Sequence, residues 1–327
     1  MSRPRDDSRV TDGEAGLTAS PVGPSHPDAR LGHRHRRGGR AGVTHASINL
    51  FYVPAAVLFL GLVAYPLIRG VWVSTTNWNG YLPNFKFTGL HNYVKLFTDP
   101  NVGTAFLNTI VYGLGSTFLQ NVIGLLFALL LNSKFPGRTA GRTLIYLPVM
   151  IAPLIMGYVM YFFVRYSNGT FNDILGVFGL APVDWMANGP RAVTIITLVN
   201  TLQFVGVAMV IYLAGLQAIP TMYYEAAELD GANAWNQFWH VTAPLLIPAI
   251  TSSVMINLIG GLKLFDVIMA LSGDAYPTNS LSTLVRRTYF STQQAGYASA
   301  IGVVMFVFIM VVSAIAQRYL SRKEVVQ

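Results

Sequence analysis

A cluster of acidic side chains interrupts the apolar second half of this chain. Three acids begin with Glu225 and end with Asp230, and acids near the start of a short helix interact favourably with its dipole. Gly231 follows directly, and glycine readily adopts the left-handed conformation that ends a helix. We therefore expect a short helix capped by Thr221, a sharp bend, and a second short helix capped by Asn233.

Small side chains accompany these acids. Ala226, Ala227 and Ala232 would let another surface approach the backbone closely. The stretch 220–248 contains the three acids and no Lys or Arg, so its net charge is −3. We expect this element to lie at a membrane surface and to face a basic partner.

Polar side chains also occur inside two long apolar stretches. Carboxamides form hydrogen bonds with sugar hydroxyls, and aromatic rings stack on the apolar faces of sugars. Hydrogen bonding between helices explains buried carboxamides equally well. The candidates for a substrate pathway are Asn200, Gln203, Phe204 and Val207 in the first stretch and Asn257, Gly261 and Leu264 in the second.

Two opposite charges end the second of these stretches. Lys263 and Asp266 are three residues apart, so they can pair if they lie on one helix. We expect an internal ion pair or a contact near the mouth rather than direct substrate binding. An unpaired Lys263 would instead favour an anionic ligand.

Motifs of the common catalytic sites are absent from the sequence. The chain has no cysteine, which excludes disulfides and thiolate metal sites. It also has no P-loop, no H-E-x-x-H and no G-x-S-x-G. We therefore predict that the chain is not an enzyme and holds no cofactor or metal.

The scarcity of charge indicates where these residues lie. Hydrophobic residues make up 53% of the 327 residues and charged residues 11%, against roughly 25% charged in average soluble chains. Long uncharged gaps reach the roughly 20 residues that a membrane-crossing helix needs. We predict an all-α polytopic membrane protein with six transmembrane helices at 50–72, 105–131, 143–164, 192–217, 244–270 and 295–317.

The distribution of Lys and Arg sets the orientation. These residues concentrate in the tail 1–46, between the second and third predicted helices, and after the last one. Positive residues favour the cytoplasmic side, so we expect both termini in the cytoplasm. We interpret the tail as disordered and topogenic rather than as a nucleic-acid-binding arm. A membrane domain would follow at 47–320, with the acidic element at 218–243 and a C-terminal tail at 321–327.

The acidic element resembles the EAA loop of binding-protein-dependent ABC importer permeases. It combines several residue types at that motif's spacing, between the fourth and fifth predicted helices. The matching residues are Glu225, Ala226, Ala227, Asp230, Gly231, Ala232, Pro244 and Pro248.

Residues 47–320 are similar to the carbohydrate-type branch of that family, which includes the maltose permease subunit. One departure is the segment 273–277, where the family often has Gly-Gly-Pro. That segment is expected on the outer face, so the departure leaves open which binding protein docks. The matching segments are 89–93 (GLHNY), 213–220 (LAGLQAIP), 262–266 (LKLFD) and 296–300 (GYASA).

The resemblance implies a type I ABC importer permease in the bacterial plasma membrane. The implied partners are a second permease subunit in a heterodimer, an ATPase dimer on the cytoplasmic side and an extracytoplasmic solute-binding protein. ATP and Mg would be bound by the ATPase, and the EAA residues would couple its closure to the membrane helices. Asn200 and Gly261 match positions that contact sugar in the maltose permease.

The implied cargo is a di- or oligosaccharide. In one alternative, the same type of ABC importer takes up glycerol phosphate or another small polar solute. Another is a stand-alone secondary transporter, which would work without an ATPase. The inverted repeat typical of many such transporters is not evident in this sequence.

Overall fold

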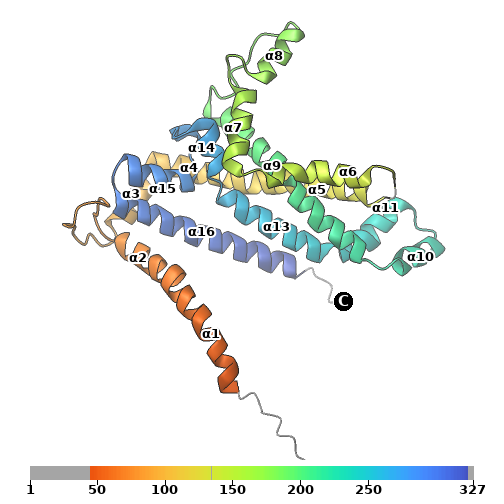
Figure 1. Ribbon diagram of the computed structural model, residues 1–327, viewed down its shortest axis with the longest axis horizontal. Helices are drawn as coiled ribbons and strands as arrows, with labels where there is room; N and C mark the ends of the chain where they lie inside the picture. Colours follow the sequence, from red (N-terminus) through yellow and green to blue (C-terminus); the bar gives the residue numbers. More distant parts are fainter. Residues whose placement is uncertain (1–44, 134, 323–327) are drawn as a thin grey trace, which may run out of the picture. The chain divides into compact units, whose positions relative to one another are not determined.

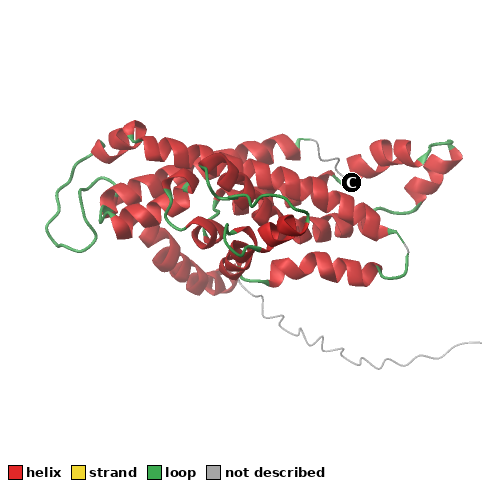
Figure 2. Ribbon diagram, turned by 90° about the horizontal axis from the view of Figure 1, so that it is seen from above, coloured by secondary structure: helices red, strands yellow, loops and turns green. Residues whose placement is uncertain are grey.

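The computed structural model describes residues 45–133 and 135–322, so the predicted tail 1–46 lies almost wholly outside the described residues. The chain separates into two compact units, Met1–Ala55 and Ala56–Gln327, and the second contains both candidate sites. The described residues form helices joined by loops (Figure 2), with one isolated bridge between Thr76 and Phe87 and no strand.

Four helical segments are long and apolar enough to cross a membrane. They correspond to the first, second, fourth and sixth predicted helices. The first is Tyr52–Val73, made by α1 (His45–Phe59), η1 (Leu60–Ala64) and α2 (Tyr65–Val73). The others are Pro100–Asn132, made by α4 (Pro100–Ile110), η2 (Val111–Gly115) and α5 (Ser116–Asn132), then α9 (Gly189–Ala218) and α16 (Ala295–Ser321).

The third predicted helix is broken in the structure. The segment Arg138–Met150, formed by α6 (Arg138–Tyr146) and η3 (Leu147–Met150), meets α7 (Pro153–Val164) at an angle of 100°. Ile151 and Ala152 are extended, with ψ of 132° and 135°. Pro153 explains the break, because proline disfavours the helical conformation in the residue before it.

The fifth predicted helix is also broken, and its predicted end at residue 270 is wrong. The segment Ala234–Leu245, formed by α11 (Ala234–Gln237), η4 (Phe238–Thr242) and α12 (Ala243–Leu245), meets α13 (Ile247–Leu262) at 65°. α13 ends at Leu262, and a separate helix, α14 (Asp266–Ser272), follows a non-helical step. The two bent pairs raise the number of crossings among the described residues to six if each counts as one.

The break after α13 depends on a local weakness of the helix and on hydroxyl groups from a later segment. The adjacent glycines Gly260 and Gly261 weaken a helix, and the amide of Leu264 bonds the Gly261 carbonyl in a tighter turn. Ser280 donates to the freed Leu264 carbonyl at 2.9 Å, and Ser282 donates to the Lys263 carbonyl at 3.3 Å. These hydroxyls replace the hydrogen bonds that a continuing helix would have made.

Helices α5, α9, α13 and α16 run side by side through the second unit (Figure 1). At one end lie α11 and α10 (Met222–Leu229), and at the other lie α3 (His91–Thr98) and α15 (Leu281–Arg286) (Figure 1). α8 (Thr170–Val177) follows α7 on the side away from α10.

α9 is the central helix of this arrangement. In its most apolar window 56% of residues are buried, against 17% for α16. α5 packs along it through small residues: a Cβ placed on Gly124 would lie 2.6 Å from the Cβ of Ala208. The two helices therefore approach more closely than larger side chains would allow.

Candidate functional site

A cavity of about 280 Å³ lies between α5, α9 and two of the helix breaks, the one before α7 and the one after α13. Pro153 contributes the first break, and Lys263, Leu264 and Phe265 contribute the second. Non-helical backbone at membrane depth is tolerated where it is buried in protein or lines a cavity. The complete lining is Gln120, Pro153, Asn200, Phe204, Val207, Ile256, Asn257, Gly260, Gly261, Lys263, Leu264, Phe265 and Asp266.

The structure brings six of the seven predicted pathway residues together around this cavity. These six are Asn200, Phe204, Val207, Asn257, Gly261 and Leu264. That they carry substrate stays a prediction.

Gln203 is the predicted pathway residue that does not line the cavity. Its side chain is fully buried, and its Nε2 donates to the Ile151 carbonyl at 3.0 Å, at the break before α7. The sequence left open that the carboxamides form hydrogen bonds to other segments of the protein instead of to a substrate. Gln203 forms such a hydrogen bond.

Three residues with carboxamide side chains, each from a different helix, line the cavity. Gln120 of α5 is 1% exposed and donates its Nε2 to the Asn200 carbonyl at 3.0 Å. Asn257 of α13 donates to the hydroxyl of Ser253 at 3.3 Å. The carboxamide of Asn200 itself forms no hydrogen bond within the described part of the chain. Polar hydrogen-bonding capacity is therefore left for a ligand.

Gln120 was missed by the sequence analysis. It stands next to a second carboxamide, Asn121, within the apolar second predicted helix. The reasoning that selected Asn200 and Asn257 would have selected it too, because buried polar groups in membrane helices require a partner.

Lys263 and Asp266 both line the cavity, but they do not pair. The expected ion pair does not form, because Lys263 follows the end of α13 and Asp266 begins α14. A contact near the mouth stays a prediction. Within residues 52–133 and 135–322 the ion pair that forms joins Arg286 and Asp274. The cavity thus carries one positive and one negative side chain.

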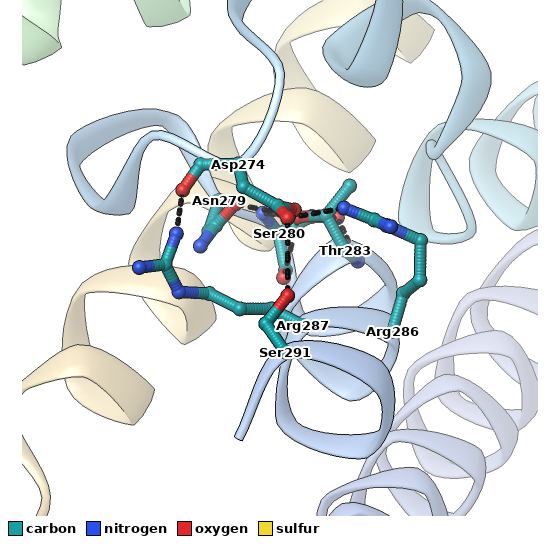
Figure 3. Close-up of polar contacts among 7 residues, drawn as sticks. All are labelled: Asp274, Asn279, Ser280, Thr283, Arg286, Arg287 and Ser291. Atoms are coloured by element: carbon teal, nitrogen blue, oxygen red, sulfur yellow. Dashed lines mark hydrogen bonds and ion pairs between the residues drawn. The ribbon is translucent and has the colours of Figure 1, made fainter. Parts of the chain in front are cut away.

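The loop after α14 is fixed next to this break (Figure 3). Asp274 lies between two arginines: its carboxylate pairs with Arg286, and its carbonyl accepts from Arg287. Ser280 and Thr283 form a reciprocal cap at the start of α15. Because Ser280 also donates to the Leu264 carbonyl, the loop and the cavity wall are held together.

The acidic element at the other end of the bundle forms two short helices, α10 and α11, as the sequence predicts. Gly231 between them has φ of +77°, the left-handed conformation. Asn233 caps α11, its side chain accepting from the amide of Asn236 at 2.9 Å. Thr221 stands at the N-cap of α10, but its side chain makes no capping hydrogen bond, contrary to the prediction. The second helix continues through η4 and α12 as far as Leu245.

One face of α10 is uncovered. Glu225, Ala226 and Asp230 are exposed, and Leu229 is 90% exposed. The other face packs back, with the hydroxyl of Tyr224 3.1 Å from that of Thr242. Of the remaining predicted coupling residues, Gly231 is exposed and Ala227 and Ala232 are half-buried. An acidic surface with one exposed apolar side chain, Leu229, is suited to contact with a protein partner.

The chain is similar to several transport proteins over most of its length. A probable starch degradation products transport system permease protein, AmyD of Thermoanaerobacterium thermosulfurigenes, is 34% identical over 280 residues, covering 85% of this chain and 94% of the relative. The trehalose/maltose transport system permease protein MalF of Thermococcus litoralis is 30% identical, covering 80% and 89%.

The fold is similar to that of a solved bacterial ABC transporter involved in the import of the acidic polysaccharide alginate. The TM-score is 0.73 at 25% identity, covering 84% of this chain and 95% of that one. A second structure of the alginate transporter, in complex with an alginate pentasaccharide-bound periplasmic protein, gives a TM-score of 0.74.

The sequence pattern of one family matches residues 120–325, which include the cavity residues and the acidic element. The chain belongs to the family of binding-protein-dependent transport system inner membrane components.

Proposed function

We propose that this chain is the transmembrane permease subunit of an ATP-driven ABC importer for a neutral di- or oligosaccharide. The observation that carries the proposal is the cavity, where the carboxamides of Gln120, Asn200 and Asn257 meet the rings of Phe204 and Phe265. Sugars present hydroxyls that carboxamides bind and apolar faces that rings stack on. The relatives named for starch products and for trehalose and maltose support the same cargo class.

The charge of the cavity separates a sugar from glycerol phosphate. Lys263 is unpaired, which by itself favours an anion. Asp266 lines the same cavity and would repel a phosphate, which carries close to two negative charges at neutral pH. A cavity with no net charge fits a neutral polyol better.

The uncovered face of α10 is proposed to bind the ATPase. Glu225, Ala226 and Leu229 offer an acidic and apolar surface that nothing in the described chain covers. Closure of an ATPase dimer on ATP and Mg would then move this element and, through α12, the broken α13 helix. Rigid-body motion of this kind requires a firm contact. No ATP or Mg would bind to the permease itself.

The remaining partners follow from the family. A second permease subunit would complete a heterodimer in the bacterial plasma membrane, with both termini of this chain in the cytoplasm. A solute-binding protein would dock on the outer side, near α3, α8 and α15. The alginate transporter of similar fold, solved in complex with a periplasmic protein, supports this partner. A stand-alone secondary transporter is disfavoured, because the family is binding-protein-dependent.

Reconstitution tests this proposal. The permease pair, its ATPase and the loaded binding protein are placed in liposomes, and uptake of labelled maltose, maltotriose, trehalose and arabinotriose is measured with and without ATP. We expect uptake of at least one of these sugars that requires both ATP and the binding protein. Uptake that continues without the ATPase would instead establish the secondary-transporter alternative.

A further inference from the structure

Two buried glutamines in this structure make almost the same contacts. Gln120 is 1% exposed and Gln203 is 0% exposed. Each donates its Nε2 to a backbone carbonyl on another segment at 3.0 Å, Gln120 to Asn200 and Gln203 to Ile151. In each, the side-chain Oε1 is buried and accepts no hydrogen bond.

Only one of the two borders the cavity. Gln120 lines it together with Asn200, whereas Gln203 does not. Because the Nε2 of Gln120 is held by the Asn200 carbonyl, the orientation of its carboxamide is fixed, and the oxygen is the end left over. The oxygen has almost no accessible surface in this conformation, so a ligand reaches it only when the side chains beside it move. A buried acceptor without a donor is unfavourable, and a ligand hydroxyl that reaches it satisfies it.

We infer that Gln120 is a specificity-determining residue of the permease, whose Oε1 accepts a hydrogen bond from one hydroxyl of the transported sugar. Gln120 thereby discriminates against a sugar that lacks this hydroxyl, since the acceptor then stays unsatisfied. The inference rests on the proposed function and adds a residue from α5 to a site otherwise built from α9 and α13.

The contact between Gln120 and a sugar hydroxyl is tested by combining permease variants with deoxygenated sugars. The complete transporter is reconstituted with wild-type permease, Gln120→Met or the matched control Gln203→Met. Both variants remove a buried carboxamide and keep its length. Maltose, maltotriose, trehalose and arabinotriose are compared with their singly deoxygenated analogues at saturating loaded binding protein. The readouts are the maximal uptake rate and the number of sugars moved per ATP hydrolysed.

The expected result is specific to Gln120. In the wild type, one deoxy analogue is moved about 3- to 10-fold less efficiently per ATP, the range of one neutral hydrogen bond. Gln120→Met moves the parent sugar with a similar loss and no longer distinguishes that analogue. Gln203→Met keeps the full discrimination, even if it lowers the amount of assembled complex.

Other outcomes overturn the inference. If Gln120→Met discriminates among the analogues as the wild type does, the oxygen does not contact sugar. If this variant fails to assemble, Gln120→Asn retracts the same carboxamide by one methylene and must weaken the discrimination. Unchanged discrimination in Gln120→Asn also overturns it. Absence of ATP-dependent uptake of every sugar by the wild type would overturn the proposed function, and the inference with it.

Discussion

The glycines beside the cavity differ in what surrounds them. Gly261 is buried, and a Cβ there would lie 2.8 Å from the Ser116 hydroxyl and 3.0 Å from the Gly113 Cα. Gly260, the preceding residue, has nothing within 4 Å of such a Cβ. Gly261 therefore serves the close packing of α13 on η2 and α5 as well as the cavity wall, which is a role the sequence alone did not reveal.

We predict opposite effects on stability for alanine at these two positions. Gly261→Ala forces α13 away from η2 and should destabilise the fold by about 1–3 kcal/mol, as overpacked cores do. Gly260→Ala meets no neighbour and should stabilise α13 by up to about 1 kcal/mol. Thermal unfolding of the two variants in the same detergent measures the difference. Equal Tm values for the two would show that the close packing at Gly261 is not present in solution.

At the scale of single residues, the sequence predicted the cavity only in part. Asn200 and Asn257 were selected because polar residues stand out in apolar helices, and both line the cavity. The same pattern selected Gln203, because helical spacing places it near Asn200. It did not reveal that the extended residues before Pro153 leave the Ile151 carbonyl free to accept from Gln203. Such a backbone acceptor is visible only in three dimensions.

At the scale of elements, α10 and its bend were predictable because they depend on local chemistry. The Gly231 turn and the Asn233 cap need only neighbouring residues, and both form. The breaks at Pro153 and after Leu262 were missed for different reasons. Proline restricts its predecessor, so the first was within reach of the sequence. The second depends on Ser280 and Ser282, which are distant in sequence and take up the freed carbonyls.

The exposed acid of α10 gives a prediction for this element. The side chain of Glu225 forms no hydrogen bond or ion pair with other described residues, so Glu225→Arg should change the free energy of unfolding by only about 0.5 kcal/mol. Reversal of its charge at a basic partner should nevertheless lower ATP-dependent uptake by roughly tenfold or more. Uptake and ATP hydrolysis stimulated by loaded binding protein measure this effect.

A matched control separates coupling from general damage. Asp173 is also an exposed acid in the first turn of a short helix, α8, which follows α7 and lies well away from α10 (Figure 1). Asp173→Arg should leave the coupling of uptake to hydrolysis intact. Normal uptake by Glu225→Arg would remove α10 as the site of coupling.

At the scale of the whole molecule, contacts between distant segments hold α3 and the residues that follow it. Lys95 donates to the Gln294 side chain at 2.7 Å, and the hydroxyl of Tyr297 donates to Asp99 at 2.9 Å. These contacts fix α3 and the start of α4 to the start of α16. The all-helical, apolar character of the chain could be predicted from composition, whereas these pairings could not, since no local pattern specifies them.

The orientation in the membrane can be tested directly, because the chain has no cysteine to remove. Ser167 follows α7 and Asn236 lies on α11, and both are exposed. We predict that a membrane-impermeant maleimide labels Ser167→Cys but not Asn236→Cys in spheroplasts. Inside-out vesicles stripped of ATPase should give the reverse. The opposite pattern would place the termini outside and exclude α10 as the contact for a cytoplasmic ATPase.

The close approach of α5 and α9 has a mechanical consequence. Gly124 lies against Ala208, and Gln120 is bonded to the Asn200 carbonyl, so we expect the two helices to move together. Asn257 stands on α13, which adjoins α12 and the acidic element at its other end. The contacts to a transported molecule would then be broken mainly by displacement of α13, which carries Asn257, while α5 and α9 keep their relative positions.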